Sequence, residues 1–467
     1  LKRRAFELSW THSQVLLRQL NASVEEAQMF DELAASLIYP NDRFRAASQV
    51  IENNIRGQSG LWSHAVSGDI PILLFQIHDQ ESLDLVKQMV KAHAYWRLKG
   101  LAVDIVIWNE DYGSYRQALQ EQIVGLIDTE LPGAQVYGKP GNVFVKTADQ
   151  LSPEDRSLFE SVARIILSDN KGTLAEQLNR NFAKANLPPL LKTNITEIET
   201  NQVDVSMPDD LLFFNGIGGF TPDGLVYKIL TDNSRISPAP WSNIIANPKF
   251  GSVISESGSA YTWAINAHEY RITPWNNDPV LDVGGEAFYL RDEISGEYWS
   301  PAPFPAKGKT PYMTTHGFGY SSFDHTESGI SSHLVTFVDK EDPIKFVILE
   351  IKNNSGRERQ LSATGFMEII LGDLRSKTNM HVLSQYDKET GALLFRNKYN
   401  SAFSERVTSN TFIDRVRFTN LILLISVSSS GETTISVLVS IPSSCLLNSA
   451  FPFENTASYS KAFSMVG

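Results

Sequence analysis

The sequence predicts a multi-domain α+β fold, in which a helical segment and a small parallel α/β region precede a large antiparallel β-sandwich. The hydrophobic pattern changes after about residue 56 from a helical period to an alternation of short apolar runs and amphipathic segments. It changes again after about residue 209, where short runs separated by turn signals replace the helical pattern. The length of 467 residues suits such an arrangement, since a chain of this size usually forms roughly two to four domains.

Residues 1–56 are predicted to be helical. Ser23 and Glu26 have the spacing of a capping box, in which the two side chains satisfy each other's free backbone amides at the start of a helix. Residues 57–185 are predicted to form the α/β region. Its apolar runs lie at 70–77, 102–108 and 142–145, and its amphipathic segments at about 81–98, 114–128 and 153–168. Strands that alternate with helices favour a parallel sheet with right-handed crossovers.

A loop ahead of the first apolar run, residues 57–69, combines several glycines and serines with Trp62, His64 and Asp69. Such a loop either lines a binding site or caps the edge of a sheet, and both interpretations stay open.

The second half of the chain is predicted to be all β. Residues 186–209 are polar and contain prolines, which is typical of a linker. Residues 210–407 then show turn signals every 8–12 residues, and segments such as 333–338 and 345–351 alternate like strands. This pattern predicts a large antiparallel β-sandwich over residues 210–407.

Residues 408–467 are predicted to be an atypical tail. The stretch 420–467 contains 12 serines and only three charged residues, whereas 20% of the whole chain is charged. Our hypothesis for this composition is a change of reading frame between about residues 408 and 428, which would leave the rest of the tail, including the single cysteine Cys445, translated out of frame.

Composition and charge exclude several classes of protein. A formal net charge of −12, without any cluster of Lys and Arg, argues against a nucleic-acid or anionic-membrane partner. One cysteine excludes a disulfide framework. The nine histidines do not fall at metal-ligand spacings, so we expect no metal and no cofactor in this chain. No segment has the roughly 18 apolar residues of a membrane span, and we therefore expect no direct span.

The densest group of candidate binding residues lies between 241 and 299, which holds half of the eight tryptophans. Sugar rings have apolar faces and a rim of hydroxyls, so their sites combine flat aromatic rings with Asn, Asp and Arg side chains. The residues that we expect to contact a glucan are Trp241, Asn243, Arg271, Trp275, Asn276, Asn277 and Asp278.

Two other interpretations of this region stay open. The aromatic residues could fill the sandwich core, with Asn276 to Pro279 forming a turn. Alternatively, two carboxylates could serve as the acid and base of a glycosidase. The available carboxylates are Glu256, Glu269, Asp278, Asp282, Glu286, Asp292 and Glu293.

The chain resembles cyclic β-1,2-glucan synthases, in the phosphorylase-like part that is related to glycoside hydrolase family 94 (formerly glycosyltransferase family 36). The resemblance covers about residues 1–405. It is carried by residues 214–224, 238–248, 255–263, 271–279, 285–292, 297–301 and 316–320, and upstream by 62–72 and 92–107.

The resemblance implies a galactose-mutarotase-like supersandwich from a long, inner-membrane-anchored enzyme, lying on its cytoplasmic face. In that family a catalytic (α/α)6 barrel follows the sandwich and shortens β-1,2-glucan with inorganic phosphate as co-substrate. The general-acid motif of the barrel and the glycosyltransferase motif do not occur in this sequence. We therefore expect a fragment without the catalytic barrel and without catalytic residues of its own, although its status as an enzyme stays uncertain.

The expected function is thus a glucan-binding and scaffolding portion of such a synthase, with β-1,2-glucan or an oligosaccharide, the barrel of the parent chain and a second copy in a homodimer as expected partners. The alternatives are a purely structural sandwich that orders the barrel or a subunit interface, and a self-sufficient glycosidase.

Overall fold

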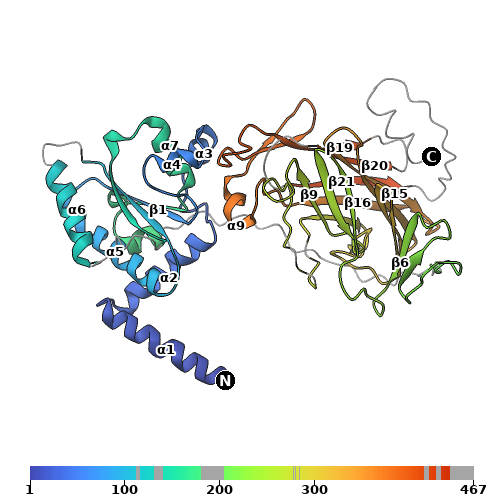
Figure 1. Cartoon of the computed structure of the whole chain (residues 1–467), viewed down its shortest axis with the longest axis horizontal. Coiled ribbons are helices and arrows are strands. Elements are labelled where there is room, and N and C mark those ends of the chain that lie inside the picture. The colour runs from blue at the N-terminus through green and yellow to red at the C-terminus, as the bar shows by residue number, and fades with distance from the viewer. Residues whose placement is uncertain are drawn as a thin grey trace. The chain divides into compact units, whose positions relative to one another are not determined.

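The computed structural model (Figure 1) divides the chain into two compact units. The α/β unit consists of residues 1–187 and 398–402, and the sandwich unit of residues 188–397 and 403–467. The structure describes residues 1–111, 116–130, 140–179, 205–276, 278, 280–282, 284–414, 420–426 and 433–441. Most of the predicted linker at 186–209 therefore lies outside the described residues.

The α/β unit is built on a four-stranded parallel sheet with the strand order β3-β2-β1-β4. Its strands are β1 (Ile72–Ile77), β2 (Asp104–Asn109), β3 (Val143–Thr147) and β4 (Ile165–Ser168). Its helices are α1 (Lys2–Gln19), α2 (Val24–Ile38), α3 (Ser48–Asn53), α4 (Ser59–Trp62), α5 (Leu83–Leu98), α6 (Arg116–Glu130), α7 (Pro153–Val162) and α8 (Leu174–Asn179), with short 3₁₀ turns η1 (Gln80–Ser82), η2 (Ala148–Gln150) and η3 (Asp169–Lys171). The predicted parallel α/β region is therefore confirmed.

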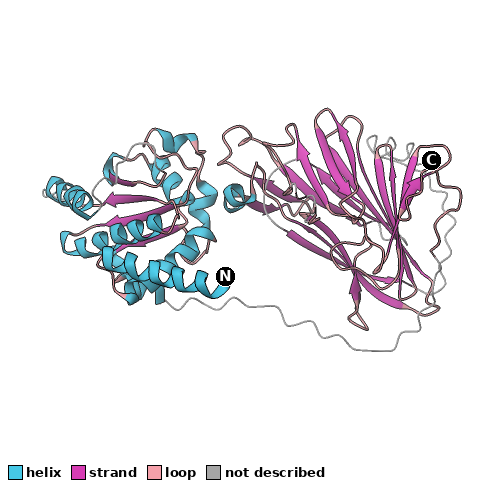
Figure 2. Ribbon diagram, turned by 60° about the horizontal axis from the view of Figure 1, so that its bottom comes forward, coloured by secondary structure: helices cyan, strands magenta, loops and turns pink. Residues whose placement is uncertain are grey.

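Helices cover both faces of this sheet, as Figure 2 shows. Successive side chains of a strand point to opposite faces, so Leu73 and Phe75 of β1 pack with α2, α5 and α6. Ile72 and Leu74, on the other face, pack with α4 and α7. Because both faces are buried, the strands are continuous apolar runs, which is typical of parallel sheets.

Two local predictions in this unit have different outcomes. The capping box is present, since the Ser23 Oγ accepts from the Glu26 N–H at 3.1 Å and the Glu26 Oε2 accepts from the Ser23 N–H at 2.9 Å. The helix expected over about 153–168 is too long, because α7 ends at Val162 and residues 165–168 form β4. Ala163 has extended backbone angles (φ −61°, ψ 128°), and the following Ile-Ile-Leu run suits a short buried strand.

A short segment from late in the chain, Lys398–Ala402, belongs to the α/β unit. The Tyr399 hydroxyl donates to the Gly68 carbonyl at 2.9 Å, and the Gln58 N–H donates to the Tyr399 carbonyl at 3.1 Å. The Tyr399 ring packs against the apolar cluster on the α4 and α7 side of the sheet. Residues that lie more than 200 positions apart in the sequence therefore share one core.

The sandwich unit contains three antiparallel sheets. A ten-stranded sheet has the order β17-β18-β19-β20-β15-β14-β13-β12-β6-β5, a four-stranded sheet has the order β11-β10-β16-β21, and a three-stranded sheet has the order β7-β8-β9. The strands are β5 (Gly218–Phe220), β6 (Val226–Thr231), β7 (Ser242–Asn247), β8 (Phe250–Ser255), β9 (Ala260–Ala264), β10 (Glu286–Asp292), β11 (Tyr298–Trp299), β12 (Tyr312–Gly317), β13 (Tyr320–Glu327), β14 (Ile330–Val338), β15 (Ile344–Asn353), β16 (Arg359–Met367), β17 (Leu383–Tyr386), β18 (Leu393–Arg396), β19 (Thr408–Asp414), β20 (Asn420–Ser426) and β21 (Thr433–Ile441). The predicted antiparallel architecture is confirmed.

The core of this unit lies between the sheets. Inward-facing residues such as Phe250, Leu290, Phe323 and Leu349 form one apolar cluster. A short helix, α9 (Arg375–Thr378), and a 3₁₀ turn, η4 (Asn379–His381), interrupt the strands. None of the described helices in either unit is long and apolar enough to cross a membrane.

The predicted tail is described in part. The backbone of β19 and β20 joins the ten-stranded sheet next to β15, and β21 pairs with β16 in the four-stranded sheet. Residues 442–467, with Cys445, lie outside the described residues. The frame change stays a hypothesis, and sequencing of the coding DNA across residues 408–428 tests it.

Candidate functional site

Three aromatic rings form the centre of the candidate site in the sandwich unit. Tyr261 and Trp263 alternate along β9 and so lie on the same face of that strand. Their ring centroids are 5.2 Å apart with an interplanar angle of 28°, and Tyr261 also stacks with Trp275 at 4.9 Å and 4°. Tyr261 is buried, whereas 39% of Trp275 is exposed. Because Tyr261 covers one face of the indole, the exposed part of Trp275 is its other face and its edge.

The loop that carries Trp275 is held from several sides. Backbone bridges join Arg271 to Trp263 and to Gly372, and Trp275 to Gly284. The Arg271 Nη1 donates to the carbonyls of Trp275 at 3.2 Å and Asp373 at 3.0 Å, and its guanidinium carbon lies 5.9 Å from the centroid of the Tyr261 ring. Arg271 therefore positions the Trp275 backbone.

A cavity of about 260 Å³ opens beside the stacked rings. Small-molecule sites typically measure about 300–1,000 Å³, so this cavity is close to the lower end of that range. Tyr261 and Trp275 provide its aromatic wall. Its polar groups come from Ser242, Ser255, Ser259, Asn276, Asp278 and Asp282. An aromatic wall facing hydroxyl, amide and carboxylate groups matches the two sides of a sugar ring.

The two carboxylates at this cavity accept hydrogen bonds from different kinds of donor. The Asp282 Oδ2 accepts from the Ser255 Oγ at 2.5 Å and from the Ser257 hydroxyl. Asp278 caps its own turn by accepting from the N–H groups of Val280 at 2.8 Å and Leu281 at 2.9 Å, and these hydrogen bonds lower its pKa. Asp278 therefore shapes the rim of the cavity as a turn residue while remaining exposed.

Glu256 fastens the segment before β7. Its carboxylate accepts from the Ser237 hydroxyl and, at 2.7 Å, from the Trp241 N–H. Burial raises the pKa of Glu256, and the neighbouring charge of Asp282 acts in the same direction. Both oxygens of Glu256 thus have protein donors, which suits an anchor better than a catalytic acid.

The structure brings together only some of the residues predicted to contact a glucan. Trp275, Asn276 and Asp278 line the cavity, whereas Trp241 and Asn243 do not. The Asn243 Nδ2 donates to the carbonyls of Gly317 and Tyr320, both at 2.9 Å. Asn277 lies outside the described residues.

Trp241 is tied into the framework instead. Its carbonyl accepts from the Glu256 N–H at 2.9 Å and from the His316 Nε2 at 3.2 Å, and its ring packs edge-on against Tyr227. Burial lowers the pKa of His316, which favours a neutral ring beside this carbonyl.

Sequence reasoning did not select Ser255, Tyr261 and Asp282 as contact residues. A usable signal was the Tyr261-Thr-Trp263 spacing, because residues two apart on a strand share a face. Ser255 and Asp282 are 27 residues apart in the sequence, and no local pattern predicts their contact.

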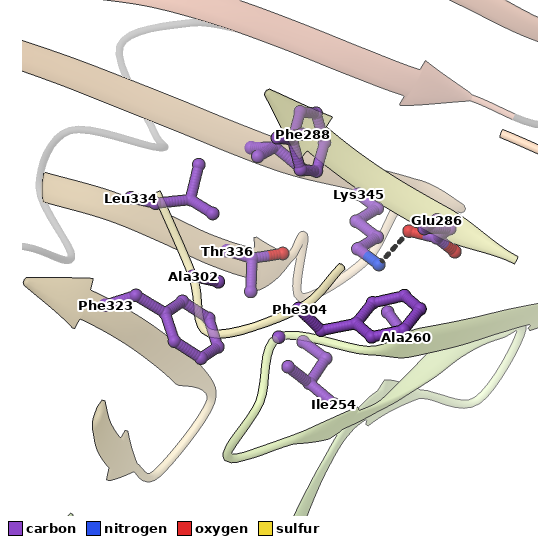
Figure 3. A pocket seen from close by; sticks show the side chains of 12 residues that line it. Ile254, Ala260, Glu286, Phe288, Ala302, Phe304, Phe323, Leu334, Thr336 and Lys345 are labelled. Atoms are coloured by element: carbon purple, nitrogen blue, oxygen red, sulfur yellow. Dashed lines mark hydrogen bonds and ion pairs between the residues drawn. The ribbon is translucent and has the colours of Figure 1, made fainter. Parts of the chain in front are cut away.

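Two other carboxylates that were candidates for acid–base chemistry are buried in ion pairs. The Lys345 Nζ lies 2.7 Å from the Glu286 Oε2, beside a cavity of only about 20 Å³ in the apolar core (Figure 3). The Glu286 Oε1 also accepts from Thr262 at 2.5 Å and Thr273 at 2.9 Å. Such a space holds a single water at most, so this cluster is part of the core.

Asp292 is the second of these carboxylates, and it pairs with Arg359 at 2.5 Å. Burial acts to raise its pKa, but hydrogen bonds from the Ser295 and Ile294 N–H groups and the charge of Arg359 lower it overall. Among the described residues, no group of three His, Cys, Asp or Glu side chains could hold a metal ion.

Comparisons with known proteins agree with this architecture. Residues 226–421 match the glycosyl hydrolase 94 supersandwich domain. The chain is 32% identical over 407 residues to a cyclic beta-(1,2)-glucan synthase from Rhizobium meliloti, a match that covers 85% of this chain and 14% of the relative. It is 35% identical over 157 residues to an N,N'-diacetylchitobiose phosphorylase from Vibrio proteolyticus and 30% identical over 187 residues to a solabiose phosphorylase from Paenibacillus borealis. These two matches cover 33% and 39% of this chain, and 20% and 24% of the relatives. The chain thus spans a quarter or less of the length of each.

Proposed function

Because this chain carries a supersandwich domain of the glycosyl hydrolase 94 family, we propose that it is the glucan-binding and scaffolding portion of a cyclic β-1,2-glucan synthase. In this role it holds a β-1,2-glucan chain or oligosaccharide, while catalysis belongs to other parts of the parent enzyme. It thereby supports the control of chain length by phosphorolysis.

The observation that carries this proposal is the open indole face of Trp275. Tyr261 covers the other face, and Arg271 holds the Trp275 backbone, so the exposed face has a fixed orientation. A fixed aromatic ring loses little conformational freedom when a ligand stacks on it. The hydroxyl, amide and carboxylate groups of Ser255, Asn276 and Asp282 lie in the same cavity and can exchange hydrogen bonds with sugar hydroxyls.

The relatives support a carbohydrate ligand at the sandwich. Their names cover a cyclic glucan synthase and phosphorylases of disaccharides, and the glycosyl hydrolase 94 match itself falls on residues 226–421 of the sandwich unit. We further propose that an (α/α)6 barrel of the parent chain completes the catalytic site with inorganic phosphate, on the cytoplasmic face of the membrane that anchors the parent, and that two copies form a homodimer.

Calorimetric titration of the full chain with β-1,2-glucooligosaccharides tests the binding function. Trp275→Ala removes the stacking surface, and we expect the affinity to fall about tenfold or more, as for other truncated aromatic anchors. Trp10→Ala is the matched control, since Trp10 is an exposed tryptophan (68%) on α1 of the other unit. Unchanged affinity in Trp275→Ala, or no binding by the unaltered chain, would overturn the proposal.

The competing function is a purely structural sandwich, and the packing of Trp275 against Tyr261 favours it as the alternative. A structural role predicts that Trp275→Ala lowers the melting temperature while glucan affinity is absent or unchanged. Trp275→Phe separates the two, because it retains an aromatic face for a sugar while it removes part of the packing volume.

A further inference from the structure

Residues 57–69, here named the Trp62 loop, contain the short helix α4, which ends at Trp62, and are closely packed in the α/β unit. A Cβ added at Gly60 would lie 2.7 Å from the Leu158 Cδ2, and one added at Gly68 would lie 2.2 Å from the Tyr399 hydroxyl oxygen. Gly68 has a φ of 76°, and Ala65 has a φ of 61° without being a glycine. Strained backbone at a non-glycine residue persists only where its surroundings enforce it, and such residues cluster at functional sites.

This loop presents an aromatic ring to solvent. Trp62 is 59% exposed. Its Nε1 donates to the Ser67 carbonyl at 3.2 Å, and this hydrogen bond restrains the orientation of the exposed indole. An exposed aromatic ring that its surroundings hold in place can stack on a ligand with little loss of conformational freedom.

A hydrogen-bond network joins the Trp62 side chain to polar groups of the same loop. The Ser67 carbonyl also accepts from the Gln58 Nε2 at 3.0 Å, and the same nitrogen donates to the Asp69 Oδ1 at 3.0 Å. Asp69 and Ser63 are exposed. An exposed indole in one network with an amide and a carboxylate, on a loop that also carries an exposed hydroxyl, has the composition of a carbohydrate contact, and the carboxylate disfavours a polyanion.

The comparisons differ in how much of the chain they cover. The sandwich unit is about three fifths of the chain, so a match over 85% of the chain must extend into the α/β unit. The four phosphorylases match only 31–39% of the chain. At least part of the α/β unit is therefore shared with a relative named for a cyclic glucan.

We propose that the Trp62 loop is a second contact for a neutral glucan chain, in which the Trp62 indole stacks on a sugar ring and Asp69 and Ser63 bond to its hydroxyls. This inference rests on the proposed function, because it takes the same ligand. It adds a second site per chain, on the α/β unit, to the one at Trp275.

Stoichiometry measured by calorimetry on the full chain tests this directly. With a short β-1,2-glucooligosaccharide we expect two sites per chain in the unaltered protein, one in Trp62→Ala, one in Trp275→Ala and none in the double variant. With a long β-1,2-glucan, Trp62→Ala should weaken binding about tenfold. Trp10→Ala should leave both measurements unchanged.

Two further variants separate binding from folding. Trp62→Phe keeps an aromatic face and should retain the second site, whereas Trp62→Leu keeps an apolar side chain and should lose it at an unchanged melting temperature. Binding by the unaltered chain that Trp275→Ala reduces and Trp62→Ala does not would overturn the second contact alone. An absence of binding by the unaltered chain would overturn the proposed function together with it.

Discussion

The two units differ in how deeply their ion pairs are buried. Among the described ion pairs of the α/β unit, each has at least one side chain that is 16% exposed or more, and its two core clusters are apolar. The sandwich unit instead contains Lys345–Glu286 and Arg359–Asp292, whose side chains are all 2% exposed or less. The ion pairs of the α/β unit can therefore lose one partner and leave the other to solvent. In the sandwich unit, removal of one partner would leave an unpaired charge buried in the core.

The largest effect is expected from breaking a buried pair. In Lys345→Ala the Glu286 carboxylate loses its counter-charge in the core, and we expect the free energy of unfolding of the sandwich unit to fall by about 3–5 kcal/mol. Hydrogen exchange followed by mass spectrometry on the full chain measures this, because it reports the α/β unit separately. The α/β unit should keep its protection.

Two matched variants sharpen this prediction. Lys309→Ala removes an equally close but exposed pair with Glu297 and should cost only about 0–1 kcal/mol. The double change Lys345→Met with Glu286→Leu removes both charges and should recover most of the loss. Equal losses in Lys345→Ala and Lys309→Ala would contradict the contrast between the units.

The pH dependence of two histidines should have opposite signs. Burial lowers the pKa of His93, in the α/β unit, to about 4 from an ordinary 6.5. The stability that neutral His93 contributes is therefore present above pH 6.5 and is lost as the pH falls toward 4, by roughly 3 kcal/mol in full. A hydrogen bond to Asp324 raises the pKa of His333, in the sandwich unit, so its contribution is present below pH 6.5 and is lost as the pH rises through the folded value.

Comparison of each histidine variant with the unaltered chain isolates the contribution of that histidine to the pH dependence of stability. Burial also raises the pKa of Asp104, in the α/β unit, to about 6, and this opposes His93 over part of the range. Between pH 7 and pH 5, His93→Gln should remove a loss of unfolding free energy that the unaltered chain shows on acidification. His333→Gln should remove a gain of unfolding free energy over the same range. Urea unfolding of each variant at both pH values checks this, and the same sign in both would refute it.

The smallest effect is expected at the helix cap. Ser23→Ala removes the hydroxyl that accepts from the Glu26 N–H, and it should lower the stability of the α/β unit by about 1 kcal/mol. Ser23→Asp retains a cap acceptor and should restore most of this in thermal unfolding. Ser23→Ala removes the acceptor of only one of the two amides in the capping box, and this contact is local to α2, so the sandwich unit should be unaffected.

Sequence patterns predicted helices and strands correctly where the hydrophobic repeat is regular over a long segment. The strand runs at 70–77 and 333–338 and the capping box at Ser23 are local signals, and the structure contains them. Strand β4 has only four residues and directly follows a helix. So short a run cannot be distinguished from a further helical turn by periodicity.

The site was predictable in composition but not in detail. Ser242 of β7 lines the cavity, and its neighbours Trp241 and Asn243 do not, since adjacent residues of an extended chain point to opposite sides. An assignment that is off by one residue therefore reverses the face. The stacking of Trp275 on Tyr261 depends on a loop path that only the bridges to Gly284 and Gly372 define.

The segment Lys398–Ala402 also determines when the α/β unit can finish folding during synthesis. On a ribosome, the apolar cluster that receives Tyr399 must wait for more than 200 residues after α8 to be made. At about 5–20 residues per second this delay is on the order of 10–40 s. During this interval Gly57 and Gly68 lack their late partner, so the α/β unit reaches its final form only after most of the sandwich unit has been synthesised.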